Sequence, residues 1–549
     1  MLGRNGIRRL KWEPLERLAG TVGLSVILVY LIGLGIHISG LPMWTCHGIT
    51  LLSAGLLAIY RRDVVSLLRH RRTRNLLLMF AALLSWILLL LLVIRHNTGG
   101  SWCCDWFEHY QRSLHFLDRG PKNQMFLNLY LLPARPPLMN VYAMYGIAIA
   151  GRDFSVYQVV SAFLDCLLLL PLALVARLFS SRGAPFSLLA ALLALNPQFF
   201  ENSTFAWTKI PTAFFVALAF YLYLVGLRRA SSSHVVGAFV SISAAMLVHY
   251  SAGPYLVLMG LHYAVMVPRR RLWRQALVAA LLSGMLLATW FGYSVARFGV
   301  KTTLESNSTV TDSRRLSPRD NLLNVRDNVI NTIVPYFMCD DFKPKGELRD
   351  VVIDVAFHAY RNNIIISMGS VGGILALLLS IRSLARRRPR VPLSERLFWI
   401  LGVPLTFLLG VASHGMRNPF GLAHICGQSL TYLGVAFLAS QAPKLPRVLK
   451  VLLVHGVIFD FIFGIAIELY LEGSTAEWTR SWNWLYKQDN HLEYLGDVVI
   501  GGVALWEAAI FAVTIAWIWA VLRSLGLLSS SPEKPSPTIE SKAANTSSS

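Results

Sequence analysis

Two carboxylates and a histidine follow the third long apolar stretch of the chain. The sequence there reads Asp-Trp-Phe-Glu-His-Tyr, which spaces Asp105, Glu108 and His109 by three and four residues. A helix would place all three on one face. The aromatic neighbours Trp106 and Tyr110 are typical of a membrane–water boundary, where burial raises the pKa of a carboxyl group and a nearby cation lowers it. This pattern suits general acid/base catalysis; the alternative is an aromatic belt with solvated charges.

Cations that suit phosphate binding stand at other predicted helix junctions. Lys209 begins an apolar stretch, where free backbone N–H groups and the helix dipole favour anions. Arg417 is able to hold a phosphate through two parallel N–H bonds, and Arg135 lies in a proline-rich segment that breaks any helix. The alternatives are a snorkelling lysine and arginines paired with acids or lipid head groups.

Further polar and aromatic residues are predicted to bind substrate, namely Trp106, Tyr110, Asn202, Trp207, Thr208, His249, Tyr250 and His414. No phosphate-binding P-loop, strand-linked dinucleotide motif or typical zinc spacing occurs. Cys103-Cys104 is a vicinal pair, and Asp340-Asp341 is an acid pair of the kind that is usually solvated.

The elements that position these residues are membrane helices. Of 549 residues, 55% are hydrophobic and 15% charged, against about 25% charged in a soluble domain. Six cysteines are too few for a disulfide scaffold. We expect an all-α polytopic protein with about 14 spans (range 11–14), near 18–37, 43–60, 75–95, 156–178, 186–200, 209–227, 235–249, 253–268, 275–297, 361–382, 394–413, 420–441, 448–471 and 498–523.

The net charge of +22 is best explained as a topology signal. Its basic clusters all fall on one side if the spans alternate, which predicts that both termini are cytoplasmic and argues against nucleic-acid binding. These clusters are Arg61, Arg62, Arg69, Arg71, Arg72 and Arg74; Arg228 and Arg229; Arg269, Arg270, Arg271 and Arg274; Arg382, Arg386, Arg387, Arg388 and Arg390; and Lys444, Arg447 and Lys450.

Five regions are predicted along the chain. They are an N-terminal helical hairpin with a basic cytoplasmic loop (1–74), a membrane core with a first outer loop at 96–155 (75–300), a large outer loop (301–360), C-terminal spans with an outer loop at 472–497 (361–528), and a disordered cytoplasmic tail (529–549).

These residues resemble those of the GT-C glycosyltransferases, membrane enzymes that use polyprenyl-phosphate sugars, and in particular the bacterial mannosyltransferase-like and aminoarabinose-transferase-like branch. The resemblance covers residues 75–300 best. It rests on Asp105-Trp106-Phe107-Glu108-His109-Tyr110, Arg135-Pro136-Pro137-Leu138, Gly151-Arg152-Asp153-Phe154, Tyr157-Gln158, Asn196-Pro197, Asn202-Ser203-Thr204 and Trp207-Thr208-Lys209. The chain departs from the family in its first two spans, which form an extra N-terminal hairpin of unknown role.

The resemblance implies a GT-C-like helix bundle that transfers a sugar from a polyprenyl-phosphate donor to an acceptor hydroxyl, with inversion. It makes Asp105 the base, with Glu108 or His109 orienting it or binding the acceptor. Lys209 and Arg417 would hold the phosphate, with Arg135 as a further candidate. A divalent cation, Mg²⁺ or Mn²⁺, is left open, and the acceptor is a glycan, a lipid or a protein.

We expect a multi-pass protein of the bacterial inner membrane with its active site facing the periplasm. Two other functions stay open. One is a transporter or flippase of lipid-linked saccharides, for which the intramembrane Asp460 would matter. The other is a non-catalytic scaffold for envelope assembly.

Overall fold

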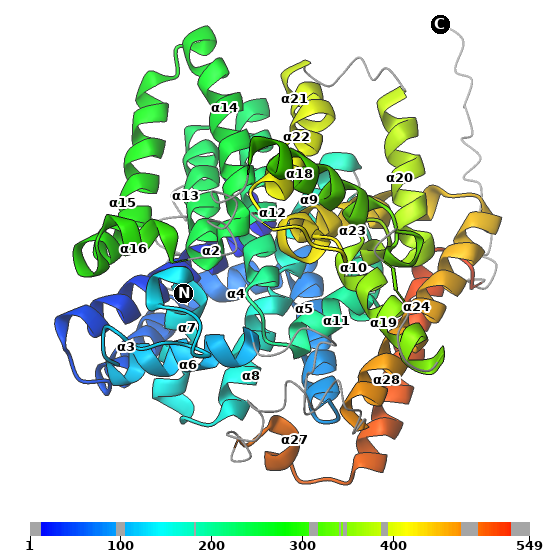
Figure 1. The fold of residues 1–549 in the computed structure, drawn as a ribbon, viewed down its shortest axis with the longest axis horizontal. Coiled ribbons are helices and arrows are strands. Elements are labelled where there is room, and N and C mark those ends of the chain that lie inside the picture. Colours follow the sequence, from blue (N-terminus) through cyan, green and yellow to red (C-terminus); the bar gives the residue numbers. More distant parts are fainter. Residues whose placement is uncertain are drawn as a thin grey trace, which may run out of the picture.

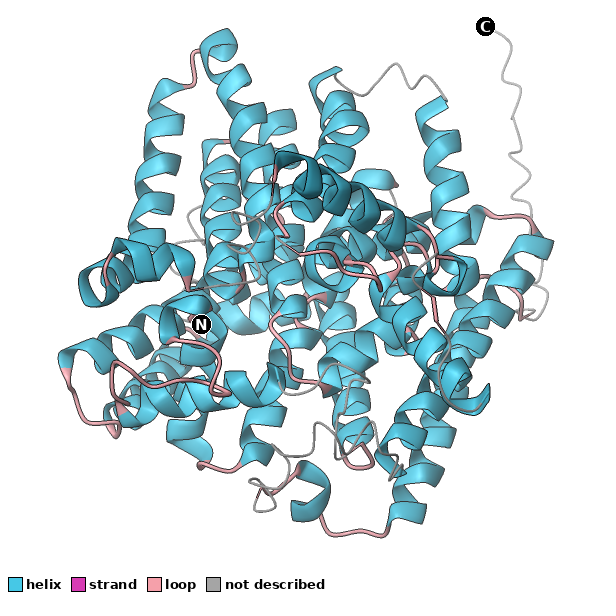
Figure 2. Cartoon of the chain, in the orientation of Figure 1, coloured by secondary structure: helices cyan, strands magenta, loops and turns pink. Residues whose placement is uncertain are grey.

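The computed structural model is all-helical in the residues that it describes, which are 12–94, 105–180, 183–306, 317–339, 342–343, 348–385, 393–414, 416–473 and 492–528. Figure 2 shows helices joined by loops, and no strand occurs within these ranges. This confirms the predicted all-α class. Cys103-Cys104, Asp340-Asp341 and the tail 529–549 lie outside the described residues.

The helices vary widely in length, from four residues to 27. They are α2 (Pro14–Ser39), α3 (Thr45–Ile59), α4 (Arg61–Arg69), α5 (Arg71–Leu91), α6 (Asp105–Asp118), α7 (Leu138–Ala150), α8 (Phe154–Cys166), α9 (Leu169–Phe179), α10 (Phe186–Ala194), α11 (Pro197–Thr204), α12 (Lys209–Arg229), α13 (Ser232–Val248), α14 (Gly253–Arg270), α15 (Trp273–Phe298), α16 (Val300–Glu305), α18 (Pro318–Ile333), α19 (Leu348–Asn362), α20 (Ser370–Ala385), α21 (Leu393–Leu397), α22 (Val403–Ala412), α23 (Gln428–Gln441), α24 (Arg447–Gly473), α27 (Leu495–Val498) and α28 (Val503–Ser524).

Short 3₁₀ and π segments join some of these helices. The 3₁₀ turns that matter for the site are η1 (Leu132–Ala134) and η2 (Tyr250–Ala252). A π segment, η7 (Ala423–Gly427), leads into α23.

Eight helices in the described residues are long and apolar enough to cross a membrane, and four shorter apolar helices accompany them. The long ones include α8 and α9 taken together as Phe154–Phe179. The chain is therefore a multi-pass membrane protein.

Two of the predicted spans, 186–200 and 361–382, are interrupted by clear helix-start or helix-end signals. The range 186–200 contains α10 and α11, because Pro197 occupies the first turn of a new helix and the Asn196 side chain accepts the Phe199 N–H as its cap. The range 361–382 contains the end of α19 and most of α20, with Gly369 at φ +95° between them. Helix α10 has nine residues, too few to cross a bilayer.

Helix α12 forms the centre of the bundle, and almost all of its residues are buried (Figure 1). It packs against α9, α13 and α23. At the flanks of the molecule, α15 and α28 expose apolar side chains such as Leu281 and Phe511, as expected for helices that face lipid. The first residue of α12 is Lys209, so the most deeply packed helix carries a predicted site residue at its start.

Candidate functional site

The acidic motif lies in a helix, which gives its acids and histidine the shared face considered from their spacing. Helix α6 begins at Asp105, and Glu108, His109 and Arg112 follow at positions that share its buried face. The Nδ1 atom of His109 lies 3.0 Å from Oδ1 of Asn140 on α7. Burial lowers the pKa of His109 to about 3, so the ring is neutral, and its contact with Asn140 fixes its orientation.

Glu108 is held by two arginines. Arg112 Nη2 lies 2.7 Å from Glu108 Oε1, and Arg135 Nε lies 3.5 Å from Oε2. Burial by itself would raise the pKa of Glu108, but the two guanidinium groups outweigh it and lower the pKa to about 2. Glu108 is thus a permanently ionised group that positions arginines, and it is a poor proton acceptor.

The loop that carries Arg135 is fixed by its backbone carbonyls. Arg112 donates to the carbonyls of Leu131 and Leu132, and Tyr250 Oη donates to the carbonyl of Pro133. The Arg135 guanidinium lies over the Tyr130 ring at 4.9 Å. Although burial acts to lower it, the pKa of Arg135 is raised by Glu108 and Asp105, so Arg135 stays charged.

Asp105 faces cations from three separate segments. Burial raises the pKa of its carboxyl group, while Arg135, Lys209 and Arg361 act to lower it and Glu108 acts to raise it. The start of α6, the η1 loop, the start of α12 and the end of α19 therefore meet around one carboxylate. A partly buried acid with a raised pKa among cations is an arrangement that enzymes use for proton transfer.

Lys209 is buried against His249 and Trp207. Its Nζ atom lies 2.7 Å from Nε2 and 3.2 Å from Nδ1 of His249, and 4.9 Å from the centre of the Trp207 ring. The Ser251 N–H donates to Nδ1 of His249, which fixes the ring. Burial and the neighbouring cations lower the pKa of His249, so this ring does not add a second positive charge.

Arg361 is a member of this cluster that the sequence analysis did not single out. Its guanidinium lies 5.0 Å from the Phe205 ring centre and 5.8 Å from that of Trp207. The His424 ring stacks on the Trp207 ring, with 5.6 Å between the ring centres. The available signal was its place at the first position of the predicted span 361–382, where a charged residue is unusual.

Three predicted residues lie elsewhere. Arg417 is 46% exposed and its Nε lies 2.9 Å from Asp327 Oδ2, so the structure pairs it with an acid on α18 and does not bring it to Asp105. Trp106 and Tyr110 pack against Phe154 of α8, at centroid distances of 4.8 and 5.2 Å, in an aromatic cluster behind the acidic face of α6.

The remaining predicted residues lie near the cluster. Thr208 and Asn202 are buried, and the Thr208 hydroxyl and the Asn202 Oδ1 atom have no hydrogen-bond partner among the described residues. His414 Nδ1 lies 2.8 Å from the Met416 carbonyl oxygen, and the charge of Lys209 acts on the ring.

The donor set does not suit a divalent cation. Within the described residues, no group of three His, Cys, Asp or Glu side chains converges. Asp105 and Glu108 are the acids of the cluster, and Glu108 is already neutralised by Arg112 and Arg135.

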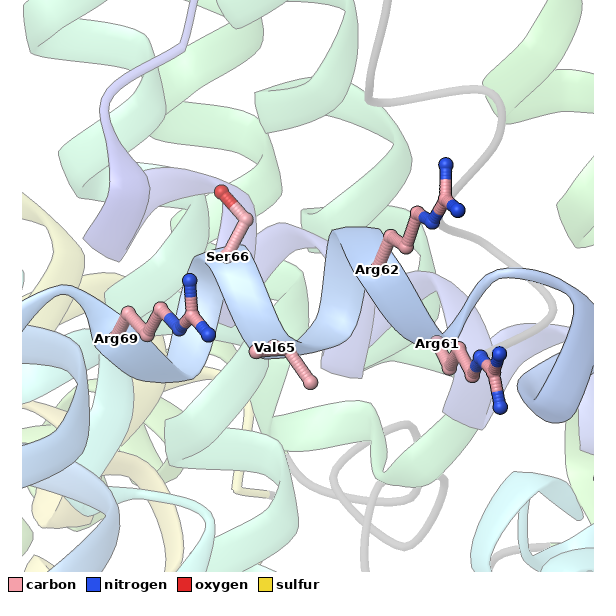
Figure 3. A pocket seen from close by; sticks show the side chains of 5 residues that line it. All are labelled: Arg61, Arg62, Val65, Ser66 and Arg69. Atoms are coloured by element: carbon pink, nitrogen blue, oxygen red, sulfur yellow. The ribbon is translucent and has the colours of Figure 1, made fainter.

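A basic hollow lies on a different part of the molecule. It has a volume of about 360 Å³ and is lined by Arg61, Arg62, Val65, Ser66 and Arg69 of α4 (Figure 3). None of these residues belongs to the Asp105 cluster, and this helix is one of the basic segments predicted to face the cytoplasm.

No protein-family model and no curated protein sequence matches the chain. Among solved structures, the chain is similar to ArnT from Cupriavidus metallidurans bound to undecaprenyl phosphate, with 14% identity, a TM-score of 0.45 and coverage of 82% of this chain and 74% of the other. It is also similar to ArnT from the same organism in the apo state, with 13% identity, a TM-score of 0.47 and coverage of 82% and 75%. At these values, the likeness assigns neither an activity nor a residue role to this chain.

Proposed function

We propose that the chain is a membrane glycosyltransferase that moves a sugar from a polyprenyl-phosphate donor to an acceptor hydroxyl. The observation that carries the proposal is the set of cations that act on Asp105, contributed by Arg135, Lys209 and Arg361, of which Lys209 and Arg361 are buried. A single acid among fixed positive charges matches a reaction in which a hydroxyl loses a proton while an anionic phosphate leaves.

In the proposed reaction, Asp105 accepts the proton of the acceptor hydroxyl as its oxygen attacks the anomeric carbon. The bond between that carbon and the phosphate oxygen breaks, and the electron pair stays on the polyprenyl phosphate. Lys209 and Arg361 stabilise this developing charge, and Arg135 is aligned beside them by Glu108. One displacement inverts the configuration of the anomeric carbon.

Burial of the cluster supports this assignment. The side chains of Lys209 and Arg361 are almost fully buried, and aromatic rings of Phe205 and Trp207 lie against Arg361. Cations in such a water-poor site act far more strongly on a leaving group than they would in bulk water. We place this site on the periplasmic or lumenal side of the membrane, opposite the basic segments.

The test is the substitution Asp105→Asn in purified protein in lipid nanodiscs. A panel of polyprenyl-phosphate sugars is supplied with a membrane extract as the acceptor source, and release of free polyprenyl phosphate is measured. The variant should lose about 10²–10⁴-fold in rate, the usual contribution of a general base. Asp118→Asn is the matched control, because Asp118 ends the same helix and pairs with Arg152 in an exposed position. Wild-type turnover by Asp105→Asn would refute the proposal.

A further inference from the structure

Helix α11 buries an unusual number of polar side chains. All eight of its residues are buried, including Gln198, Glu201, Asn202 and Ser203. It lies beside α10 and α12 and packs against α5, α8, α19 and α24 (Figure 1). A helix surrounded on all sides by other helices would ordinarily be apolar all round.

Several of these polar atoms have no hydrogen-bond partner in the described part of the protein. They are both side-chain polar atoms of Gln198, both carboxyl oxygens of Glu201 and the Oδ1 atom of Asn202. By contrast, the Thr204 hydroxyl on the same helix donates to the Phe200 carbonyl at 3.0 Å. A buried polar group without a partner costs about 1–3 kcal/mol, so a run of such groups indicates a ligand or ordered water.

The unpartnered side chains lie on one face of α11. Gln198, Glu201 and Asn202 are spaced by three and four residues, which places their Cβ atoms about 5–6 Å apart on a helix. One amide with free donor and acceptor atoms and one carboxyl group at this spacing can bind adjacent hydroxyl groups of a single small ring.

This face adjoins the Asp105 cluster through Arg361. Helix α19, which carries Arg361 near its end, packs against α11, and the Arg361 charge acts on Glu201 and Glu468 as well as on Asp105. The chain also connects the two directly, since Phe205 and Trp207 follow α11, contact Arg361 and lead to Lys209.

We propose that Gln198, Glu201 and Asn202 bind the hydroxyl groups of the sugar on the donor lipid and select which sugar is transferred. The inference rests on the proposed glycosyl transfer and adds the residues that determine specificity. Lys209 and Arg361 then hold the phosphate of the donor, while α11 holds the sugar that is bonded to it. The substrate class is a polyprenyl-phosphate monosaccharide with neighbouring free hydroxyls.

The test compares donors that differ only in the sugar. Binding of undecaprenyl phosphate and of a panel of undecaprenyl-phosphate pentoses and hexoses is measured in nanodiscs. Wild-type protein should bind at least one sugar-bearing lipid more tightly than undecaprenyl phosphate itself. Glu201→Gln and Gln198→Met should weaken that preferred donor by about 10- to 100-fold and leave undecaprenyl phosphate unchanged, as expected when one or two buried hydrogen bonds to a ligand are lost.

The control is Thr204→Val, which removes a hydroxyl already satisfied within its own helix and should not change sugar preference. Thermal unfolding of each variant shows that it is folded. If folded Glu201→Gln and Gln198→Met both keep wild-type sugar preference, the buried groups hold water only and the inference is wrong. If they lose that preference while Asp105→Asn keeps full turnover, the sugar site stands and the proposed transfer mechanism falls.

Discussion

Arg135 Nε lies 3.5 Å from Glu108 Oε2, which joins the acidic helix α6 to the loop that follows it. The other oxygen of Glu108 binds Arg112, and Arg112 in turn holds the carbonyls of Leu131 and Leu132. The network is closed: one carboxylate and two guanidinium groups fix the loop from which Arg135 reaches Asp105. Glu108 therefore acts on the site through the position of Arg135.

Glu108→Gln should destabilise the protein strongly. The substitution leaves the fully buried Arg112 and the mostly buried Arg135 without their counter-ion, and an unpaired buried charge typically costs about 3–5 kcal/mol. Asp118→Asn, which breaks an exposed pair with Arg152, should cost at most about 1 kcal/mol. Thermal unfolding of both variants in detergent measures the difference, and equal midpoints would show that the buried network does not stabilise α6.

The pH dependence of turnover should report Asp105. Because burial raises its pKa, kcat/KM should fall as the pH decreases through a value above the ordinary 3.8 of an aspartate. Arg361→Gln removes a cation that favours the ionised carboxylate, so this acidic limb should move to higher pH, while Arg361→Lys should leave it nearly in place. Arg417→Gln is the control, since Arg417 pairs with Asp327 and should not move the limb. If the acidic limb of kcat/KM is the same in the wild type and all three variants, Asp105 is not the titrating base.

Sequence spacing was sufficient for the local part of the site. Asp105, Glu108 and His109 share a helix face because of positions three and four apart, and Lys209 begins its helix as the apolar pattern required. The charge of Arg361 at the start of a predicted span marks it as unusual, but only the packing of distant helices brings the end of α19 toward Asp105. Arg417 is predicted as a phosphate ligand from its residue type and its place at a helix junction. In the structure it pairs instead with Asp327, which is distant in the sequence.

The start of α11 can be predicted from the local sequence, but the lack of partners on its polar face cannot. The predicted span 186–200 includes Asn196 and Pro197, although a cap and a first-turn proline indicate a new helix. The buried polar face of α11 is visible in the sequence only as a short polar segment, because its lack of partners depends on the helices that surround it.

Lys209→Met should weaken binding of the donor phosphate. A charge-assisted hydrogen bond from a buried cation is worth about 1.5–3 kcal/mol, which corresponds to about 10- to 150-fold in affinity. Binding of undecaprenyl phosphate, a polyprenyl phosphate of the proposed donor class, measures the effect. Lys301→Met removes an exposed lysine and should have no effect. An unchanged affinity in Lys209→Met would move the phosphate site away from the start of α12.

Orientation in the membrane can be tested with single cysteines in a cysteine-free background. Ser66→Cys lies on the basic helix α4 and should react with a membrane-impermeant maleimide only when the cytoplasmic side is open (Figure 3). Ser317→Cys, at the start of α18, is exposed and should react from the opposite side. Labelling of both positions from the same side would contradict the proposed topology and the outward-facing site.

Asp460 separates the transferase from a transporter. Its Oδ1 atom accepts the Tyr360 hydroxyl at 2.9 Å and its Oδ2 atom accepts the Ser370 N–H at 2.8 Å, so it joins α24 to the end of α19 and the start of α20. A transporter that uses this intramembrane acid needs it to gain and lose a proton, and Asp460→Asn would then abolish movement of lipid-linked sugar across a vesicle membrane.

In a transferase the residue is structural. Asparagine keeps one acceptor, so the variant should lose about 1 kcal/mol of stability and keep turnover close to wild type. Tyr360→Phe removes the hydrogen bond from the Tyr360 hydroxyl but keeps the Asp460 carboxylate, so it should show a similar loss of stability and similar turnover. Loss of activity in Asp460→Asn alone, with Tyr360→Phe and Asp105→Asn both active, would favour transport over glycosyl transfer.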